Sequence, residues 1–284
     1  MPRKPNVVVT KSNHLVEATY ALSLAEQRLL LLLLALAHVD SRQPLTVGMC
    51  HTIRLTDVME VYGVSRPQAY ELLCQVAQRL YARSVVIHGP FAHQPDIAQI
   101  ETRWVASIRY HDGQGALSLV FAPDILPFLS QLRERFTSYR LKSVASMTSG
   151  YAIRIYEMLV QWREAGSRTI ELRWLREHLD LGEKYPNIRD FKNRILNPAI
   201  AQINAHSDLC VNWEQHKRGR VVYALTFIFS PKTEPPQSDD PFLTPSESKP
   251  LKVPLTREYV QQHAQPGESW DDAWERLRRK QDKL

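Results

Sequence analysis

The first third of the chain opens with an unusually long apolar run. Residues 29–37 are all apolar, and a capping box precedes them, in which Glu26 follows Ser23 by three positions. A capping box marks the first turn of a helix because each side chain satisfies a backbone amide that has no partner inside the helix. The pattern predicts a helix over residues 24–38.

A second capping box starts another helix. Gln68 follows Ser65 by three positions, and Pro67 lies in the first turn, where its missing N–H costs nothing. Apolar residues then recur at three- and four-residue spacing, which predicts a helix over residues 66–80 with one face toward the core.

Shorter elements complete the first half of the chain. The expected elements besides the two long helices are a short helix over 57–62 and strands over 52–55, 84–88, 103–110 and 116–121. Asp112-Gly113, between the last two strands, is typical of a hairpin turn. Helix, strand, helix, turn, helix and β-ribbon is the order of a winged helix, a helix-turn-helix motif that carries a hairpin.

The second half repeats this order without obvious sequence identity. The expected elements are helices over 149–164, 174–179 and 188–206 and strands over 169–172, 209–215 and 220–229. On the first of these helices, Ala152, Ile155, Leu159 and Trp162 are expected to be buried. The repeated order predicts an α+β fold with two tandem winged-helix domains.

The composition changes after residue 230. Seven prolines occur from Pro231 to Pro254, which predicts a largely disordered linker, and a short amphipathic helix with Trp270 and Trp274 is expected beyond it. We expect three segments: residues 1–135 as an N-terminal winged-helix domain, residues 136–231 as a C-terminal winged-helix domain, and residues 232–284 as the Pro-rich linker with its short helix.

Charge and cysteine content narrow the class of protein. The net charge is +6, and residues 136–230 hold 14 basic and nine acidic side chains, so a polyanionic partner fits the second domain. Three isolated cysteines fit neither a disulfide framework nor a zinc site. The longest apolar run is too short to span a bilayer, and no signal-peptide core follows Met1. We expect a cytoplasmic protein without a membrane partner.

The common signatures of catalysis are absent from the sequence. It contains no P-loop, no H-E-x-x-H and no G-x-S-x-G motif. No two of the ten histidines stand two positions apart, so the histidine pair expected of a nicking enzyme is missing. We expect neither enzymatic activity nor a metal or other cofactor.

Basic side chains converge in the second half from two elements. The helix over 188–206 leaves Arg189, Asn193 and Arg194 toward solvent, with Lys192 at the boundary of its core stripe. Arginine can form two hydrogen bonds to guanine and asparagine two to adenine. The following hairpin adds three cations around a glycine turn, which are Lys217, Arg218 and Arg220. The helix alone could equally be a solvated charged face, but the two elements together favour DNA binding.

The equivalent helix of the first half is less basic. Arg66, Gln68 and Tyr70 stand near its start and can reach bases or phosphates. Polar side chains on any exposed helix look the same, so an ordinary solvated surface remains the alternative there.

Three ordered blocks of sequence carry a family resemblance over about residues 11–230. The blocks are Asn13-His14-Leu15-Val16-Glu17-Ala18 with residues 22–28, Phe136-Thr137-Ser138-Tyr139 with residues 151–157, and Phe191-Lys192-Asn193-Arg194-Ile195-Leu196 with residues 199–204. In these blocks the chain resembles the iteron-binding replication initiators of theta-replicating plasmids. The Pro-rich tail has no counterpart in this resemblance.

The resemblance implies how such a protein works. Two winged-helix domains would hold successive major grooves of one directly repeated site, with monomers starting replication and dimers repressing their own gene at an inverted repeat. Lys192, Asn193 and Arg194 would be the main readers of the second domain. Their counterparts in the first domain would be Ser65, Arg66, Gln68 and Tyr70. The implied partners are double-stranded DNA, a second copy of the chain, and the host initiator, replicative helicase and chaperones.

Two other functions fit part of the evidence. A plain winged-helix transcriptional repressor would use the same DNA-binding surface on a single palindrome. A nicking relaxase is disfavoured because the histidine pair is missing.

Overall fold

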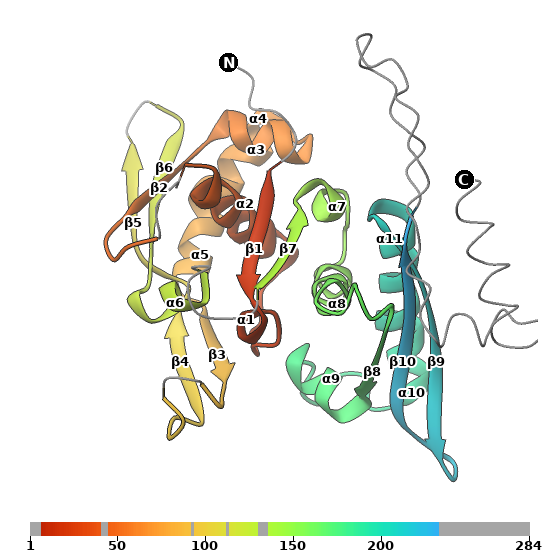
Figure 1. The fold of residues 1–284 in the computed structure, drawn as a ribbon. Helices are drawn as coiled ribbons and strands as arrows, with labels where there is room; N and C mark the ends of the chain where they lie inside the picture. The colour runs from red at the N-terminus through yellow and green to blue at the C-terminus, as the bar shows by residue number, and fades with distance from the viewer. Residues whose placement is uncertain (1–6, 41–44, 92–93, 112–113, 130–135, 233–284) are drawn as a thin grey trace, which may run out of the picture. The chain divides into compact units, whose positions relative to one another are not determined.

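A computed structural model describes residues 7–40, 45–91, 94–111, 114–129 and 136–232 (Figure 1). By its internal contacts the chain divides into two units, Met1–Lys232 and Thr233–Leu284. The Pro-rich linker and the short amphipathic helix expected after residue 232 lie outside the described residues.

The first half of the chain folds as a winged helix. Its elements are α2 (Leu24–Asp40), β2 (Cys50–Arg54), α3 (Leu55–Tyr62), α4 (Arg66–Glu71), η1 (Leu72–Val76), α5 (Ala77–Tyr81), β5 (Val105–His111) and β6 (Ala116–Phe121). The three strands form an antiparallel sheet in the order β2-β6-β5. The winged helix predicted for this half is therefore confirmed.

Helix α2 is the central core element of this domain. From Leu29 to Ala37 no residue is more than 3% exposed, as expected of a helix that is hydrophobic on all its faces. The predicted capping box starts it, since the Ser23 amide donates to Glu26 Oε2 at 2.7 Å and the Glu26 amide donates to Ser23 Oγ at 3.3 Å.

The helix predicted over residues 66–80 forms, but its hydrogen bonding changes in the middle. α4 leads directly into a π-helical segment, η1, and then into α5. Leu72, Leu73, Val76 and Leu80 remain buried through this change. A π turn alters the register by less than one residue per turn, so the apolar spacing of the sequence does not reveal it.

A two-stranded hairpin is inserted between the helix pair and the wing. It consists of β3 (Ser84–His88) and β4 (Gln99–Arg103), which pair antiparallel. The single strand predicted over residues 103–110 is wrong, because β4 ends at Arg103 and β5 begins at Val105. Trp104 is fully buried between them, and this burial redirects the chain from one sheet to the other.

The second half folds as another winged helix. Its elements are α8 (Gly150–Val160), β8 (Ser167–Glu171), α9 (Leu172–His178), α10 (Ile188–Phe191), η3 (Lys192–Leu196), α11 (Asn197–His206), β9 (Leu209–Arg218) and β10 (Val221–Pro231). The sheet order is β8-β10-β9, which matches the order of the first domain strand for strand. Figure 1 shows the long β9–β10 hairpin beside α10 and α11.

The first helix of this domain is shorter than predicted. α8 ends at Val160 instead of residue 164, and Ala152, Ile155 and Leu159 are buried as expected. The expected burial of Trp162 is wrong. Trp162 lies in the turn after the helix, is 46% exposed, and its ring lies 5.6 Å from the Arg168 guanidinium.

A small sheet connects the two halves. β1 (Val8–Ser12) pairs antiparallel with β7 (Phe136–Arg140), so the expected boundary between residues 135 and 136 falls directly before a strand that pairs with the N-terminal one. Four short helices complete the described elements, namely α1 (Asn13–Val16), η2 (Pro123–Ile125), α6 (Leu126–Leu129) and α7 (Lys142–Ala145).

Buried polar contacts stabilise the same junction. The Lys11 ammonium donates to Glu157 Oε1 at 2.6 Å, and both side chains are at most 2% exposed. The Tyr139 hydroxyl donates to the same oxygen, and burial together with the Glu157 carboxylate raises the pKa of Tyr139. Because a buried ion pair is costly to break from one side, these contacts hold the N-terminal strand against α8.

Candidate nucleic-acid interface

The second winged helix presents exposed polar side chains at the start of its helix over residues 188–206. Asn187 caps it, with its Oδ1 accepting from the Arg189 amide at 2.8 Å. Phe191, Ile195 and Leu196 are buried, which fixes the rotation of the helix.

That rotation leaves three of the predicted readers in solvent. Arg189, Asn193 and Arg194 are exposed, and within the described part of the chain their side chains make no hydrogen bond or ion pair. The surface is therefore free to donate to an external acceptor such as a guanine edge or a phosphate oxygen.

Lys192 is placed differently from its neighbours. Its ammonium donates to Gln215 Oε1 on β9 and lies 5.5 Å from the centre of the Trp213 ring. Lys192 therefore links the helix to the hairpin, and its half-buried stem is less available to a base than the side chains of Asn193 and Arg194.

The hairpin adds the other cations. Arg218 pairs with Val221 across a tight turn in which Gly219 has a φ of 62°, a conformation that favours glycine. Lys217, Arg218 and Arg220 are exposed at this end of the hairpin, and the Arg218 guanidinium lies 5.1 Å from the Tyr223 ring. The hairpin thus carries positive charge at its tip, as a wing that follows a phosphate backbone requires.

The first winged helix offers a weaker version of this surface. The Ser65 amide and hydroxyl both donate to Gln68 Oε1, at 2.9 and 3.0 Å, so the Gln68 oxygen is used by the cap and only its amide nitrogen remains for another partner. Arg66 is exposed, and Tyr70 is 59% exposed. A side-chain hydrogen bond with Cys74 raises the pKa of Tyr70.

One further cation of the first domain was not predicted as a contact. Arg109 on β5 is exposed at a place that corresponds to the wing of the second domain. Arg79, by contrast, lies 3.8 Å from Glu26 and is partly neutralised by it. In the sequence, the signal for Arg109 was its position three residues before the predicted hairpin turn at Asp112-Gly113.

The polar groups that join the two winged helices were also missed. Arg154 Nη2 donates to the Ala18 carbonyl at 2.7 Å, and Arg168 Nη2 donates to Glu17 Oε1 at 2.6 Å. Arg154 is one of two charged residues in a mostly apolar helix, and this interruption is the sequence signal for its role.

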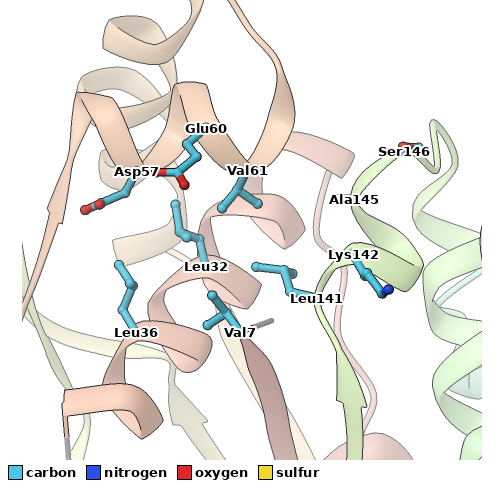
Figure 2. Close-up of a pocket in the computed structure, with 10 residues that line it drawn as sticks. All are labelled: Val7, Leu32, Leu36, Asp57, Glu60, Val61, Leu141, Lys142, Ala145 and Ser146. Atoms are coloured by element: carbon cyan, nitrogen blue, oxygen red, sulfur yellow. The ribbon is translucent and has the colours of Figure 1, made fainter. Parts of the chain in front are cut away.

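A further pocket lies between the first winged helix and α7. Figure 2 shows it between α2, α3 and α7, and its volume is about 200 Å³. Its lining is mainly apolar and includes Leu32, Leu36 and Leu141, while Asp57, Glu60 and Lys142 add charges of both signs. The side chains predicted to contact DNA are not among those that line it.

The described residues form neither a metal-binding group nor a membrane-spanning helix. Among the described residues, no three His, Cys, Asp or Glu side chains are grouped to hold a metal ion. In the same part of the chain, no helix is both long and apolar enough to cross a membrane. Cys50, Cys74 and Cys210 are unpaired.

Two protein-family models together match most of the chain. Residues 8–160 match the family described as Initiator Replication protein, WH1, and residues 171–229 match the one described as Initiator Rep protein, WH2. The first match extends from β1 to the end of α8, and the second extends from the end of β8 into β10.

Individual relatives agree with this assignment. The "Replication initiation protein" of Escherichia coli is 27% identical over 226 residues, which cover 78% of this chain and 69% of the relative. The "PI protein" of Escherichia coli is 26% identical over 226 residues, with 69% and 74% of the two chains covered.

A solved structure has the same fold. The Pi initiator protein, crystallised in complex with iteron DNA, aligns with a TM-score of 0.69 and 24% identity over 82% of this chain and 100% of that chain. The likeness includes both winged-helix domains.

Proposed function

Because the chain belongs to the initiator replication protein family, we propose that it starts plasmid replication by binding directly repeated origin DNA with both winged helices. Each domain contributes one recognition helix to one of two successive major grooves, which lie about 10 base pairs apart on B-DNA. The family is one of DNA-binding initiators and not of enzymes.

One observation carries this proposal. Arg189, Asn193 and Arg194 on the recognition helix and Lys217, Arg218 and Arg220 on the wing are exposed, and none of these six side chains forms an ion pair in the described part of the chain. The five Arg and Lys side chains among them carry like charges that repel each other. A polyanion bound by the helix and the wing therefore gains affinity from each of these cations.

The test is binding of the full chain to the DNA that flanks its own gene. We expect footprints that repeat in tandem, each covering two successive major grooves on one face of the duplex. A minicircle that carries only this DNA and the gene should replicate in a bacterial host. A single palindromic footprint without replication would contradict the proposal and favour a plain transcriptional repressor.

The finer parts of the proposal concern assembly. We propose that a dimer binds an inverted repeat near the gene and represses it, and that the monomer at the direct repeats recruits the host initiator and helicase in the cytoplasm, with chaperones acting on the dimer. Support comes from the relative named as a replication initiation protein. A reporter gene behind the inverted repeat that is not repressed by the chain would remove the dimer from this scheme.

A further inference from the structure

A second cavity lies where the two winged helices meet, away from every side chain predicted to contact DNA. It has a volume of about 340 Å³ and lies between residues 20–24, the first turn of α8 and the end of α9. The first domain lines it with Gln27 and Arg83, and the second with Gly150, Arg154 and Lys184.

Arg154 forms a buried and incompletely satisfied wall of this cavity. It is 3% exposed, its Nη2 donates to the carbonyls of Ala18 at 2.7 Å and His178 at 3.0 Å, and its guanidinium lies 3.9 Å from the centre of the Tyr20 ring. Its Nε and Nη1 are buried without a hydrogen-bond partner. No carboxylate of the described residues pairs with this cation, although an unpaired buried charge is among the costliest features a fold can carry.

The other charged groups around the cavity are mostly positive. Lys184 is exposed, and its ammonium has no partner in the described part of the chain. Arg83 is held at 3.2 Å from Glu26, and Asp180 is the acidic residue of the lining. Glu26 neutralises Arg83 and Asp180 offsets one further cation, so these three cations and two carboxylates leave a net charge of +1, which favours an anion.

The start of α8 adds to this field. Ser149 caps the eleven-residue helix, and the amides of Gly150 and Tyr151 precede its first internal hydrogen bond. The positive end of the helix dipole thus points toward the cavity that Arg154 lines. The start of α8 and the Arg154 guanidinium each favour an anionic ligand, for separate reasons.

We propose that this cavity binds a phosphate group, either as inorganic phosphate or as part of a small phosphorylated metabolite. Phosphate offers several oxygens to the guanidinium, to the Lys184 ammonium and to the first amides of α8. The cavity is larger than one phosphate, so it has room for a nucleoside part as well. Because both winged helices line it, the bound anion stabilises the arrangement in which they are joined.

The experiment is a titration of the full chain, without DNA, with inorganic phosphate and separately with adenosine 5′-monophosphate. Sodium chloride keeps the ionic strength constant, and calorimetry and thermal unfolding are the two readouts. We expect saturable binding at one site and a rise in Tm with ligand concentration. Binding of both ligands identifies phosphate as sufficient, binding of the nucleotide alone identifies the metabolite as the source, and binding of neither overturns the proposal.

Variants separate this cavity from general surface charge. K184Q should weaken binding by about tenfold or more, since a hydrogen bond to a charged group is lost. R154M should abolish binding if it folds, and K184Q keeps the test valid if it does not. R173Q is the matched control, because Arg173 is an exposed arginine of α9 that does not line the cavity. An equal effect of K184Q and R173Q, or binding that does not saturate, would refute the site.

Discussion

The two winged helices of this chain share their topology and differ in their surfaces. Their sheets run β2-β6-β5 and β8-β10-β9, and each recognition helix contains one π-helical segment, Leu72–Val76 in the first and Lys192–Leu196 in the second. Among the described residues, the second domain has five exposed basic side chains without an ion pair on its helix and wing, whereas the first domain has Arg66 and Arg109 in these places. The fold is thus the same twice, while the charge that favours DNA is concentrated in one copy.

The π-helical segments show why the shared geometry does not depend on one residue. In the second domain Pro198 is the second residue after η3, and the Asn197 amide donates to the Lys192 carbonyl five residues earlier. The first domain has no proline after η1, yet its helix widens in the same part of its course. The π-helical turn therefore results from the winged-helix packing and not from a proline. Pro198 lies at a position where the α-helical hydrogen bond is already absent.

The largest expected effect concerns the junction that makes the two copies one unit. E157Q leaves the buried Lys11 charge without its carboxylate and should lower the free energy of unfolding by about 3–5 kcal/mol. Chemical denaturation of the full chain measures it. The double variant K11M/E157Q removes both charges and should recover most of the loss.

A single-variant loss below 1 kcal/mol would contradict this account of the junction. It would show that β1 and α8 are held mainly by the β1–β7 pairing and by apolar packing.

The next effect breaks the symmetry of DNA recognition. R194A removes a side chain that is exposed and unpaired, and should cost about 1–3 kcal/mol of binding while relaxing preference at one or two positions of the repeat. Q68A should change preference about one helical turn away, because the domains hold successive grooves. Binding to a set of singly substituted repeats measures both.

R173A serves as the control, since it removes an exposed arginine from α9 without touching the recognition helix. Its base preference should equal that of the wild type. If Q68A and R194A altered the same positions, or if neither altered any, the two-groove arrangement would be wrong.

A smaller effect compares the two wings. K217A and R218A should weaken binding to all sequences alike and reduce the slope of log K against log salt by about one unit for each lost phosphate contact. R109A tests the corresponding strand of the first wing and should change the slope less, because fewer cations lie around it. Equal changes for the two wings would show that the charge difference between the domains does not govern phosphate contact.

How much of this could be read from the sequence depends on the range of the interactions. Capping boxes and apolar spacing act within one helix, so Ser23 with Glu26 and Ser65 with Gln68 predicted two helix starts that the structure confirms. The repeated element order predicted both winged helices, because each element is specified by residues that are close together in the sequence.

Features that depend on distant residues were not predicted. β4 forms because it pairs with β3, and Trp162 is exposed because α8 ends two residues before it. Lys192 was expected as a reader, yet its ammonium contacts Gln215, 23 residues later.

The smallest expected effect is a pH dependence at the junction. His178 lies against Trp174, with ring centres 3.7 Å apart, and near His88 of the first domain at 5.3 Å. Burial, together with the nearby charges of His88 and Arg154, lowers the pKa of His178 below its usual value of 6.5, although a hydrogen bond to the Trp174 carbonyl opposes the shift. The unfolded chain therefore binds this proton more readily than the folded one. Stability from this group is complete above pH 6.5 and is lost as the pH falls toward the lowered pKa.

Replacing this histidine isolates its share of the pH dependence. H178Q removes the titrating group, so the fall in unfolding free energy between pH 7.5 and pH 5.5 should be shallower than in the wild type by on the order of 1 kcal/mol or less. H216Q is the matched control, since His216 lies on the wing, where its Nε2 is 2.7 Å from Thr226 Oγ1. Should H178Q and the wild type lose stability in parallel on acidification, the burial of His178 between the two winged helices would not be what links the junction to pH.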